Sequence, residues 1–207
     1  MSEIPGDPRS LHSTDMLHDW RASTRRPIVF LHGFGGHPNA YDLGPLATAL
    51  RSTEIHRVIG PIEAGAGFSW WTDETGHDPT PEALDAALDA LTAQLPDSTD
   101  PVVLVGFSQG AAVALGLALL RPSAVPPVAA VVAVAGFLVF PPDRIAGRRP
   151  VLFVHPTDDA VVDVFLAERA ARVLTRHGIQ CVLTEIAGDH SWSSDVIRPI
   201  AEFLCGS

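Results

Sequence analysis

Strand-like apolar runs alternate with helical patterns along most of the chain, and this alternation constrains the fold more than any other feature. Six runs are expected strands: residues 27–33, 54–61, 101–106, 128–136, 150–155 and 180–186. Three of them, at 101–106, 128–136 and 150–155, are continuously apolar. Such runs are typical of central parallel strands that helices cover on both faces.

The segments between these runs have helical spacing. The clearest is residues 80–95, where Thr80 can cap the helix, Pro81 suits the first helical position, and leucines recur on one face. Residues 161–177 form another, with Gly178 at the stop position. Further helices are expected at 109–120, at 194–204 and near 42–51. Strand alternating with helix predicts an α/β fold with a mostly parallel central sheet flanked by helices on both faces.

Length and composition indicate a compact globular protein. The 207 residues fit a single domain, residues 1–207, in which residues 1–25 form an N-terminal extension or an edge hairpin. Charged residues make up 18% of the chain, below the roughly 25% of an average soluble domain. The formal net charge is −10 and the sequence has no basic cluster, so we expect no nucleic-acid partner.

Nothing in the sequence favours secretion or membrane insertion. The two cysteines, Cys181 and Cys205, make no disulfide framework and are expected to be reduced thiols. Residues 1–20 lack the basic and apolar regions of a secretory signal. The uncharged stretch 128–140 is shorter than the ~20 residues that a spanning helix needs. We therefore expect a cytoplasmic protein with no stable membrane insertion.

A glycine-flanked serine stands where an expected strand meets the helical segment 109–120. The pentapeptide Gly106-Phe107-Ser108-Gln109-Gly110 fits the pattern G-x-S-x-G in the strand–turn–helix context of a nucleophile elbow. Its glycines remove side chains that would clash as strand and helix close up, which exposes the Ser108 hydroxyl. The helix N-terminus then offers N–H groups and a partial positive charge to an oxyanion. A tight turn with an incidental serine is the alternative.

A nucleophilic serine needs a general base, and chain order narrows the nine histidines. In chains of this organisation the acid and then the histidine follow the serine, each in a loop after a later strand. Three histidines follow the serine: His155, His177 and His190. His155 ends an expected strand, where it can simply pack, and His177 stands at a helix end, where a cation is favourable. His190 lies in a polar loop between the last strand and the last helix, and is the predicted base.

The loop after the fifth expected strand offers the acid. It contains Asp158, Asp159 and Asp163. A carboxylate there would accept a hydrogen bond from one ring nitrogen of His190, which fixes the imidazole tautomer and stabilises the imidazolium. Asp159 is the preferred candidate. Asp158 is the main alternative, with turn formation or capping of the next helix as its other role, and Asp143 is a more distant one.

The oxyanion needs two donors. The first is the backbone N–H of Gln109, which opens the helix after the serine. The second is expected from the glycine-rich stretch 31–36, Leu-His-Gly-Phe-Gly-Gly, which follows the first clear strand. There Phe34 would supply its N–H, and its ring could wall the pocket. A flexible turn is the alternative interpretation of this stretch.

These motifs together resemble the phospholipase/carboxylesterase family of α/β hydrolases, which includes bacterial carboxylesterases and acyl-protein thioesterases. The matching stretches are LHGFGG (31–36), SWWTD (69–73), VGFSQGAAVAL (105–115), HPTDDAVV (155–162) and GDH (188–190). The resemblance implies an α/β-hydrolase fold without a large cap domain. It also implies a serine esterase with a Ser108, Asp159 and His190 catalytic triad, and with an oxyanion hole formed by the N–H groups of Phe34 and Gln109.

The sequence departs from the family pattern at two places. The family motif runs His-Gly-x-x-Asp before Val-Val, and this spacing favours Asp159 over Asp158 as the acid. Pro156 stands at the position where the family usually has the glycine. Proline stiffens the turn that carries the acid. In the glycine-rich loop the family more often has an aspartate near Gly36, so the pocket loop is expected to differ.

The expected reaction is hydrolysis of small to medium carboxylic esters through an acyl-enzyme, with a small-molecule ester as the partner and no metal or cofactor. An apolar pocket is expected from aromatic residues near the site: Phe34, Trp70, Trp71, Phe137 and Trp192. Two alternatives stay open. An acyl thioesterase would use the same triad, and a non-catalytic binding module on the same fold would not need one. The oligomeric state, monomer or homodimer, is also open.

Overall fold

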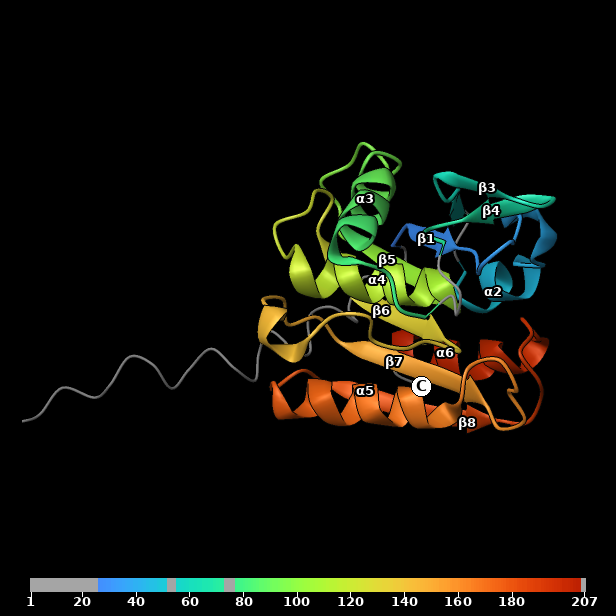
Figure 1. Ribbon diagram of the computed structural model, residues 1–207. Helices are drawn as coiled ribbons and strands as arrows, with labels where there is room; N and C mark the ends of the chain where they lie inside the picture. The colour runs from blue at the N-terminus through green and yellow to red at the C-terminus, as the bar shows by residue number, and fades with distance from the viewer. Residues whose placement is uncertain (1–25, 52–54, 73–76, 206–207) are drawn as a thin grey trace, which may run out of the picture.

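The centre of the protein is a fully parallel six-stranded sheet with the order β2-β1-β5-β6-β7-β8 (Figure 1). The computed structural model describes residues 26–51, 55–72 and 77–205, so the expected extension or hairpin at residues 1–25 lies outside the described residues. The strands are β1 (Ile28–Leu31), β2 (Ile55–Val58), β5 (Val102–Phe107), β6 (Val128–Val134), β7 (Val151–Pro156) and β8 (Cys181–Ile186). Each falls within or overlaps one of the six expected runs, and the predicted α/β class is confirmed.

The helices also lie where their spacing predicts them. They are α2 (Gly44–Ala49), α3 (Pro81–Thr92), α4 (Gln109–Leu120), α5 (Val164–Arg176) and α6 (Ile197–Cys205). Thr80 caps α3, because its hydroxyl oxygen accepts the N–H of Ala83 at 3.2 Å. At α5 the cap is Asp163, whose carboxylate accepts the N–H of Phe165 at 2.8 Å. Asp158 therefore does not cap this helix.

Alternate residues of each strand face the two helical layers. In β1, Val29 and Leu31 belong to the core formed with α3, α4 and α5, whereas Ile28 and Phe30 belong to the core formed with α2 and α6. Figure 1 shows α4 and α5 in front of the sheet and α6 behind it. Residues 109–119 of α4 are buried on all sides, because α3 packs on the side of α4 that faces away from the sheet. Burial on both faces explains why the central strands read as unbroken apolar runs.

A small antiparallel hairpin was not expected from the sequence. It consists of β3 (Ile62–Ala64) and β4 (Gly67–Ser69), and Phe68 of β4 also pairs with Gly36 in the loop after β1. Three-residue strands are too short to show an alternating pattern, which is why the sequence did not reveal them. Through the Gly36–Phe68 pairing, the hairpin holds the loop after β1 beside the segment that leads from β4 toward α3.

The remaining regular elements are short. They are the single-turn 3-10 helices η1 (Pro38–Ala40), η2 (Pro142–Arg144) and η3 (Ser194–Val196). No large cap domain is therefore present among the described residues. The apolar stretch at 128–140 forms the buried strand β6 and its following loop. Within the described ranges no helix has both the length and the apolar character needed to cross a membrane.

Candidate active site

Ser108 occupies a sharp turn between β5 and α4. Its backbone has φ 53° and ψ −118°, a positive-φ conformation that residues other than glycine rarely adopt. The flanking glycines make the turn possible. A Cβ on Gly106 would lie 2.5 Å from the Cα of Ala111, and one on Gly110 would lie 2.5 Å from the carbonyl oxygen of Leu31. The two glycines of the G-x-S-x-G pattern are thus required by close backbone packing on both sides of the serine.

The structure brings Ser108, His190 and Asp159 into one hydrogen-bonded chain. The Ser108 Oγ lies 3.0 Å from His190 Nε2, and His190 Nδ1 lies 2.7 Å from Asp159 Oδ2. The carboxylate side chain exposes no surface, whereas the imidazole is 16% exposed. This geometry fits the tautomer in which Nδ1–H donates to the carboxylate and Nε2 accepts from the serine hydroxyl.

The Asp159 carboxylate has partners for both of its oxygens. Oδ1 accepts the N–H groups of Val161 at 2.9 Å and Val162 at 2.8 Å, while Oδ2 faces His190. Burial acts to raise the pKa of Asp159, but the hydrogen bonds from His190, Val162 and Val161 outweigh it, so the pKa is lowered. The carboxylate is therefore charged at neutral pH and held in one orientation.

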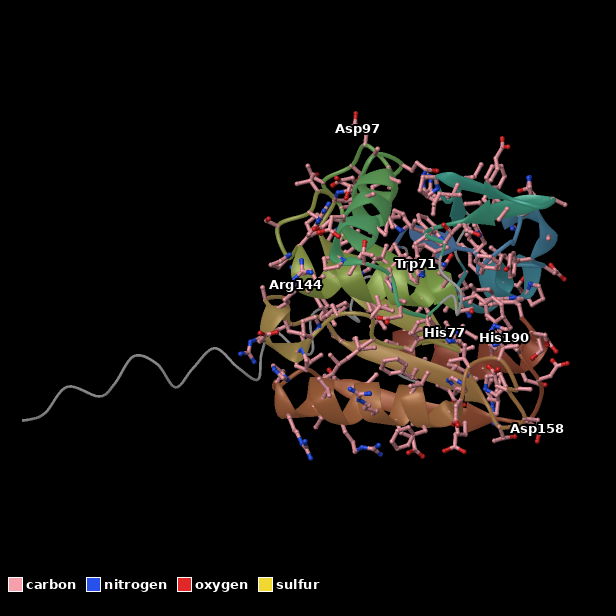
Figure 2. All side chains as sticks on the ribbon, in the orientation of Figure 1. Trp71, His77, Asp97, Arg144, Asp158 and His190 are labelled. Atoms are coloured by element: carbon pink, nitrogen blue, oxygen red, sulfur yellow. The ribbon has the colours of Figure 1, made fainter. Side chains whose placement is uncertain are left out.

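The alternative candidates lie elsewhere. Asp158 is exposed and points toward the edge of the molecule, away from His190 (Figure 2). Asp143 is exposed in η2. His177 caps the end of α5, with Nδ1 2.9 Å from the carbonyl oxygen of Val173. Within the part of the chain described here, none of these three side chains forms a hydrogen bond with Ser108.

His155 packs against the acid loop, a contact that the sequence did not reveal. The side chain is fully buried, and Nε2 lies 2.9 Å from the carbonyl oxygen of Val162 and 3.6 Å from Asp159 Oδ2. Its Nδ1 has no hydrogen-bond partner among the described residues. The sequence predicted that His155 ends a strand and can pack there. Its approach to the Asp159 carboxylate could not be predicted, because it depends on how the loop after β7 folds back over the strand.

The loop after β1 packs against the turn at Ser108. A Cβ on Gly33 would lie 3.3 Å from the Cβ of Ser108, which places this loop against the nucleophile elbow. Three of its N–H groups donate within the protein: Gly33 to Tyr41 Oη at 3.1 Å, Gly35 to Ser69 Oγ at 3.2 Å and Gly36 to the carbonyl oxygen of Gly33 at 3.0 Å. Among the described residues, no partner is found for the N–H of Phe34, the position selected from the sequence.

The backbone N–H and the side-chain amide of Gln109 have different surroundings. Its backbone N–H belongs to the first residue of α4, where N–H groups have no partner within the helix. Its side chain is 1% exposed, with Oε1 2.9 Å from the N of Trp70 and Nε2 3.0 Å from the carbonyl oxygen of Trp71. The sequence pointed to the backbone group alone, and nothing in its local pattern could have revealed these partners 38 and 39 residues away.

The predicted aromatic pocket residues have different environments. Phe34 is 55% exposed, whereas Trp70, Trp71 and Phe137 expose 2% or less and pack in the core. Trp192 is half-buried, and its ring meets three other aromatic rings edge-on: Phe30, Tyr41 and Phe107. Phe107 in turn lies 5.0 Å from the His190 ring. Phe137 lines a cavity of about 240 Å³ beside α5. A role for these five side chains in substrate binding stays a prediction.

No metal-binding cluster accompanies this site. Across residues 26–51, 55–72 and 77–205, no group of three or more His, Cys, Asp or Glu side chains is placed to hold a metal ion. The side-chain groups that the structure brings together here are the Ser108 hydroxyl, the His190 imidazole and the Asp159 carboxylate.

The chain is similar in structure to known esterases. Esterase PE8 has 28% sequence identity and a TM-score of 0.73, with 86% of this chain and 91% of that chain covered. A carboxylesterase from Mesorhizobium loti has 18% identity, a TM-score of 0.73 and coverage of 91% and 92%. The Bacillus cereus carboxylesterase has 17% identity, a TM-score of 0.72 and coverage of 87% and 88%. The two more distant proteins show the shared fold alone.

Sequence comparison points in the same direction. A comparison with curated proteins found no match. Residues 70–206, well over half of the chain, match the family model described as Phospholipase/Carboxylesterase. This segment contains Ser108, Asp159 and His190 and the loops that carry them. The chain therefore belongs to the phospholipase/carboxylesterase family of hydrolases.

Proposed function

We propose that this hydrolase is a serine carboxylesterase that cleaves small to medium carboxylic esters through an acyl-enzyme. The observation that carries the proposal is the chain of contacts from Ser108 Oγ to His190 Nε2 at 3.0 Å and from His190 Nδ1 to Asp159 Oδ2 at 2.7 Å. A serine, an imidazole and a buried carboxylate in this order are the parts of an activated nucleophile.

In the first step, the Ser108 oxygen forms a bond to the ester carbonyl carbon while its proton moves to His190 Nε2. The carbonyl π electrons move to the carbonyl oxygen, which becomes an oxyanion. The resulting imidazolium is stabilised by Asp159, which stays ionised throughout. The lowered pKa of Asp159 supports this role, because the carboxylate holds its charge across the neutral range.

The oxyanion would be bound by the N–H groups of Phe34 and Gln109. Two observations support this assignment: the Phe34 N–H has no partner among the described residues, and Gln109 opens α4 directly after the serine. The partial positive charge at the N-terminus of α4 adds to the stabilisation. Each donor acts on charge that develops only as the bond to the serine forms.

The cycle closes in two steps. The tetrahedral intermediate collapses, the bond to the leaving alcohol breaks, and the alkoxide takes the proton from His190. Water then attacks the acyl-enzyme with His190 as general base, and a second collapse returns the proton to Ser108 and releases the acid. Every proton transfer in this scheme passes through the imidazole of His190.

The absence of a large cap among the described residues supports a site open to small-molecule esters. The exposed ring of Phe34 would contact the substrate beside the scissile bond. The same machinery could also act on acyl thioesters, so the experiment must include them.

The test is a panel of nitrophenyl esters and acyl thioesters with matched acyl chains of graded length, measured for the parent and for Ser108→Ala. We expect hydrolysis of short and medium esters, and a loss in Ser108→Ala on the order of 10³–10⁶ in turnover. Faster turnover of thioesters than of esters with the same acyl chain would make the protein a thioesterase. Unchanged turnover in Ser108→Ala would overturn the serine mechanism.

A further inference from the structure

We propose that residues 69–71, Ser69-Trp70-Trp71, act as a clamp that holds the two N–H donors of the oxyanion hole at a fixed separation. Ser69 and the side chain of Gln109 are the positioning residues of this clamp. The inference rests on the proposed function, because the clamp has a catalytic meaning only if Phe34 and Gln109 bind an oxyanion. It assigns a role to side chains that touch neither the serine nor the histidine.

One end of the clamp is attached to the nucleophile elbow. The Gln109 side chain accepts the N–H of Trp70 at 2.9 Å and donates to the carbonyl oxygen of Trp71 at 3.0 Å. A side-chain amide that pairs with one N–H and one carbonyl of a neighbouring segment fixes both the direction of that segment and its distance from the amide. Because Gln109 also supplies a proposed oxyanion donor, the clamp is tied to that donor through a single residue.

The other end is attached to the loop that carries the second donor. Ser69 Oγ accepts the N–H of Gly35 at 3.2 Å, and Trp70 Nε1 donates to the carbonyl oxygen of His32 at 3.0 Å. These contacts lie on both sides of Phe34 in the sequence. The position of the Phe34 N–H is therefore set by the clamp from the residues before and after it.

The clamp is buried and packed closely on its outer side. Ser69 and Trp70 expose 0% and 1% of their surface, and the His32 ring stacks on Trp70 at 5.5 Å. A Cβ on Gly60 would lie 2.5 Å from the carbonyl oxygen of Ser69, and the Gly60 N–H donates to His32 Nε2 at 2.9 Å. Burial lowers the pKa of His32, which keeps this nitrogen able to accept. Trp71, labelled in Figure 2, lies inside the molecule.

The consequence is specific to the transition state. Without Ser69 Oγ, the N–H of Gly35 loses its acceptor and the loop can relax, so the Phe34 N–H shifts relative to Gln109. An oxyanion forms after substrate has bound, so the loss falls on kcat and not on KM. Removing one oxyanion donor costs about 10²–10³ in kcat, and displacing it should cost less, about 10- to 100-fold.

The test compares Ser69→Ala with Ser98→Ala. Ser98 is a matched control because its Oγ accepts a backbone N–H, that of Asp100, at 3.0 Å, in the loop before β5 at the opposite end of the strand from Ser108. Three quantities are measured for each variant: kcat per labelled active site, KM for a nitrophenyl ester, and the inhibition constant of a trifluoromethyl ketone. The ketone forms a tetrahedral oxyanion adduct with a serine nucleophile, so it reports on the oxyanion hole directly.

We expect Ser69→Ala to lose about 10- to 100-fold in kcat with KM within about twofold of the parent. The ketone should bind more weakly by a similar factor, and Ser98→Ala should match the parent. A parental kcat, a rise in KM alone, or unchanged ketone affinity would overturn the clamp. If Ser69→Ala does not fold, Gln109→Glu replaces it, because glutamate keeps an acceptor for Trp70 and loses the donor to Trp71. Failure of the proposed function is distinguishable, since Ser108→Ala would then stay active.

Discussion

At the scale of single residues, the environment of Asp159 decides which of two neighbouring aspartates can serve the histidine. Its carboxylate exposes no surface, accepts two backbone N–H groups and lies 2.7 Å from His190 Nδ1. Asp158 is exposed, and its backbone N–H donates to the carbonyl oxygen of Gly188 at 3.0 Å. The two residues are adjacent in sequence and opposite in environment, which makes them a natural pair for comparison.

Asp159→Asn should reduce kcat by about 10³–10⁴-fold, because an amide in this place favours the wrong imidazole tautomer and cannot stabilise the imidazolium. Asp158→Asn removes the same charge next to it in the chain and should stay within about twofold of the parent. Steady-state hydrolysis of a nitrophenyl ester by the two variants measures the difference. A crippled Asp158→Asn beside an active Asp159→Asn would reverse the assignment of the acid.

The lowered pKa of Asp159 also predicts a pH dependence of stability. The unfolded chain holds this proton with the ordinary pKa of 3.8, and the folded chain holds it less tightly. The charged carboxylate therefore stabilises the fold at all pH values above 3.8, and this contribution is lost as the pH falls through the lower folded pKa.

Urea unfolding of the parent and Asp159→Asn, at a series of pH values from 7 to 3, measures this contribution. The difference in free energy of unfolding should be constant near neutral pH and should narrow below 3.8. If the difference in free energy of unfolding widened on acidification, the fold would favour protonated Asp159. That result would contradict the hydrogen bonds that the Asp159 carboxylate accepts.

At the scale of elements, the turn from β5 into α4 is built on close backbone contact. Within α4, Gly110 packs against the end of β1, where a Cβ would lie 2.5 Å from the carbonyl oxygens of both Leu31 and His32. On Gly116, nearly two turns further along, a Cβ would lie 3.0 Å from Leu88 Cδ2 and 3.6 Å from Leu84 Cδ1, both at the far ends of flexible side chains. The same helix therefore holds one glycine that is required and one that is not.

Gly110→Ala should destabilise the protein by about 2–3 kcal/mol, because a side chain must push two backbone segments apart. Gly116→Ala should change stability by less than about 1 kcal/mol, since the gain in helix propensity offsets a small shift of Leu88. Thermal or urea unfolding of both variants gives the comparison. Equal stabilities would show that the contact at Gly110 is not tight.

At the scale of the whole molecule, the parallel sheet gathers the proposed catalytic groups at the edge where its strands end. Phe34 follows β1, Ser108 follows β5, Asp159 follows β7 and His190 follows β8, so all four stand beyond carboxyl ends of strands. The connections from β1 and β5 run to opposite sides of the sheet, and crevices between such strands are where ligands bind in open α/β folds. The topology, and not any local signal, brings Ser108 and His190 together although they are 82 residues apart in the chain.

This topology explains which features could be predicted from the sequence. The strands and helices were accessible because continuous apolar runs and helical spacing are local patterns. The proposed triad was accessible because chain order after each strand restricts the candidates. The role of Ser69 and the side-chain contacts of Gln109 and His155 were not accessible, because they depend on tertiary proximity that leaves no periodicity in the chain.

The most direct test of the central claim is the site of covalent labelling by a fluorophosphonate. A fluorophosphonate forms a stable bond to an activated serine oxygen. Ser108 is 7% exposed, and its Oγ lies 3.0 Å from Nε2 of His190, the proposed base. Peptide mass analysis of labelled, active protein should place one adduct on Ser108, and prior denaturation should abolish labelling. Activity without labelling, or an adduct on another residue, would contradict the proposed function.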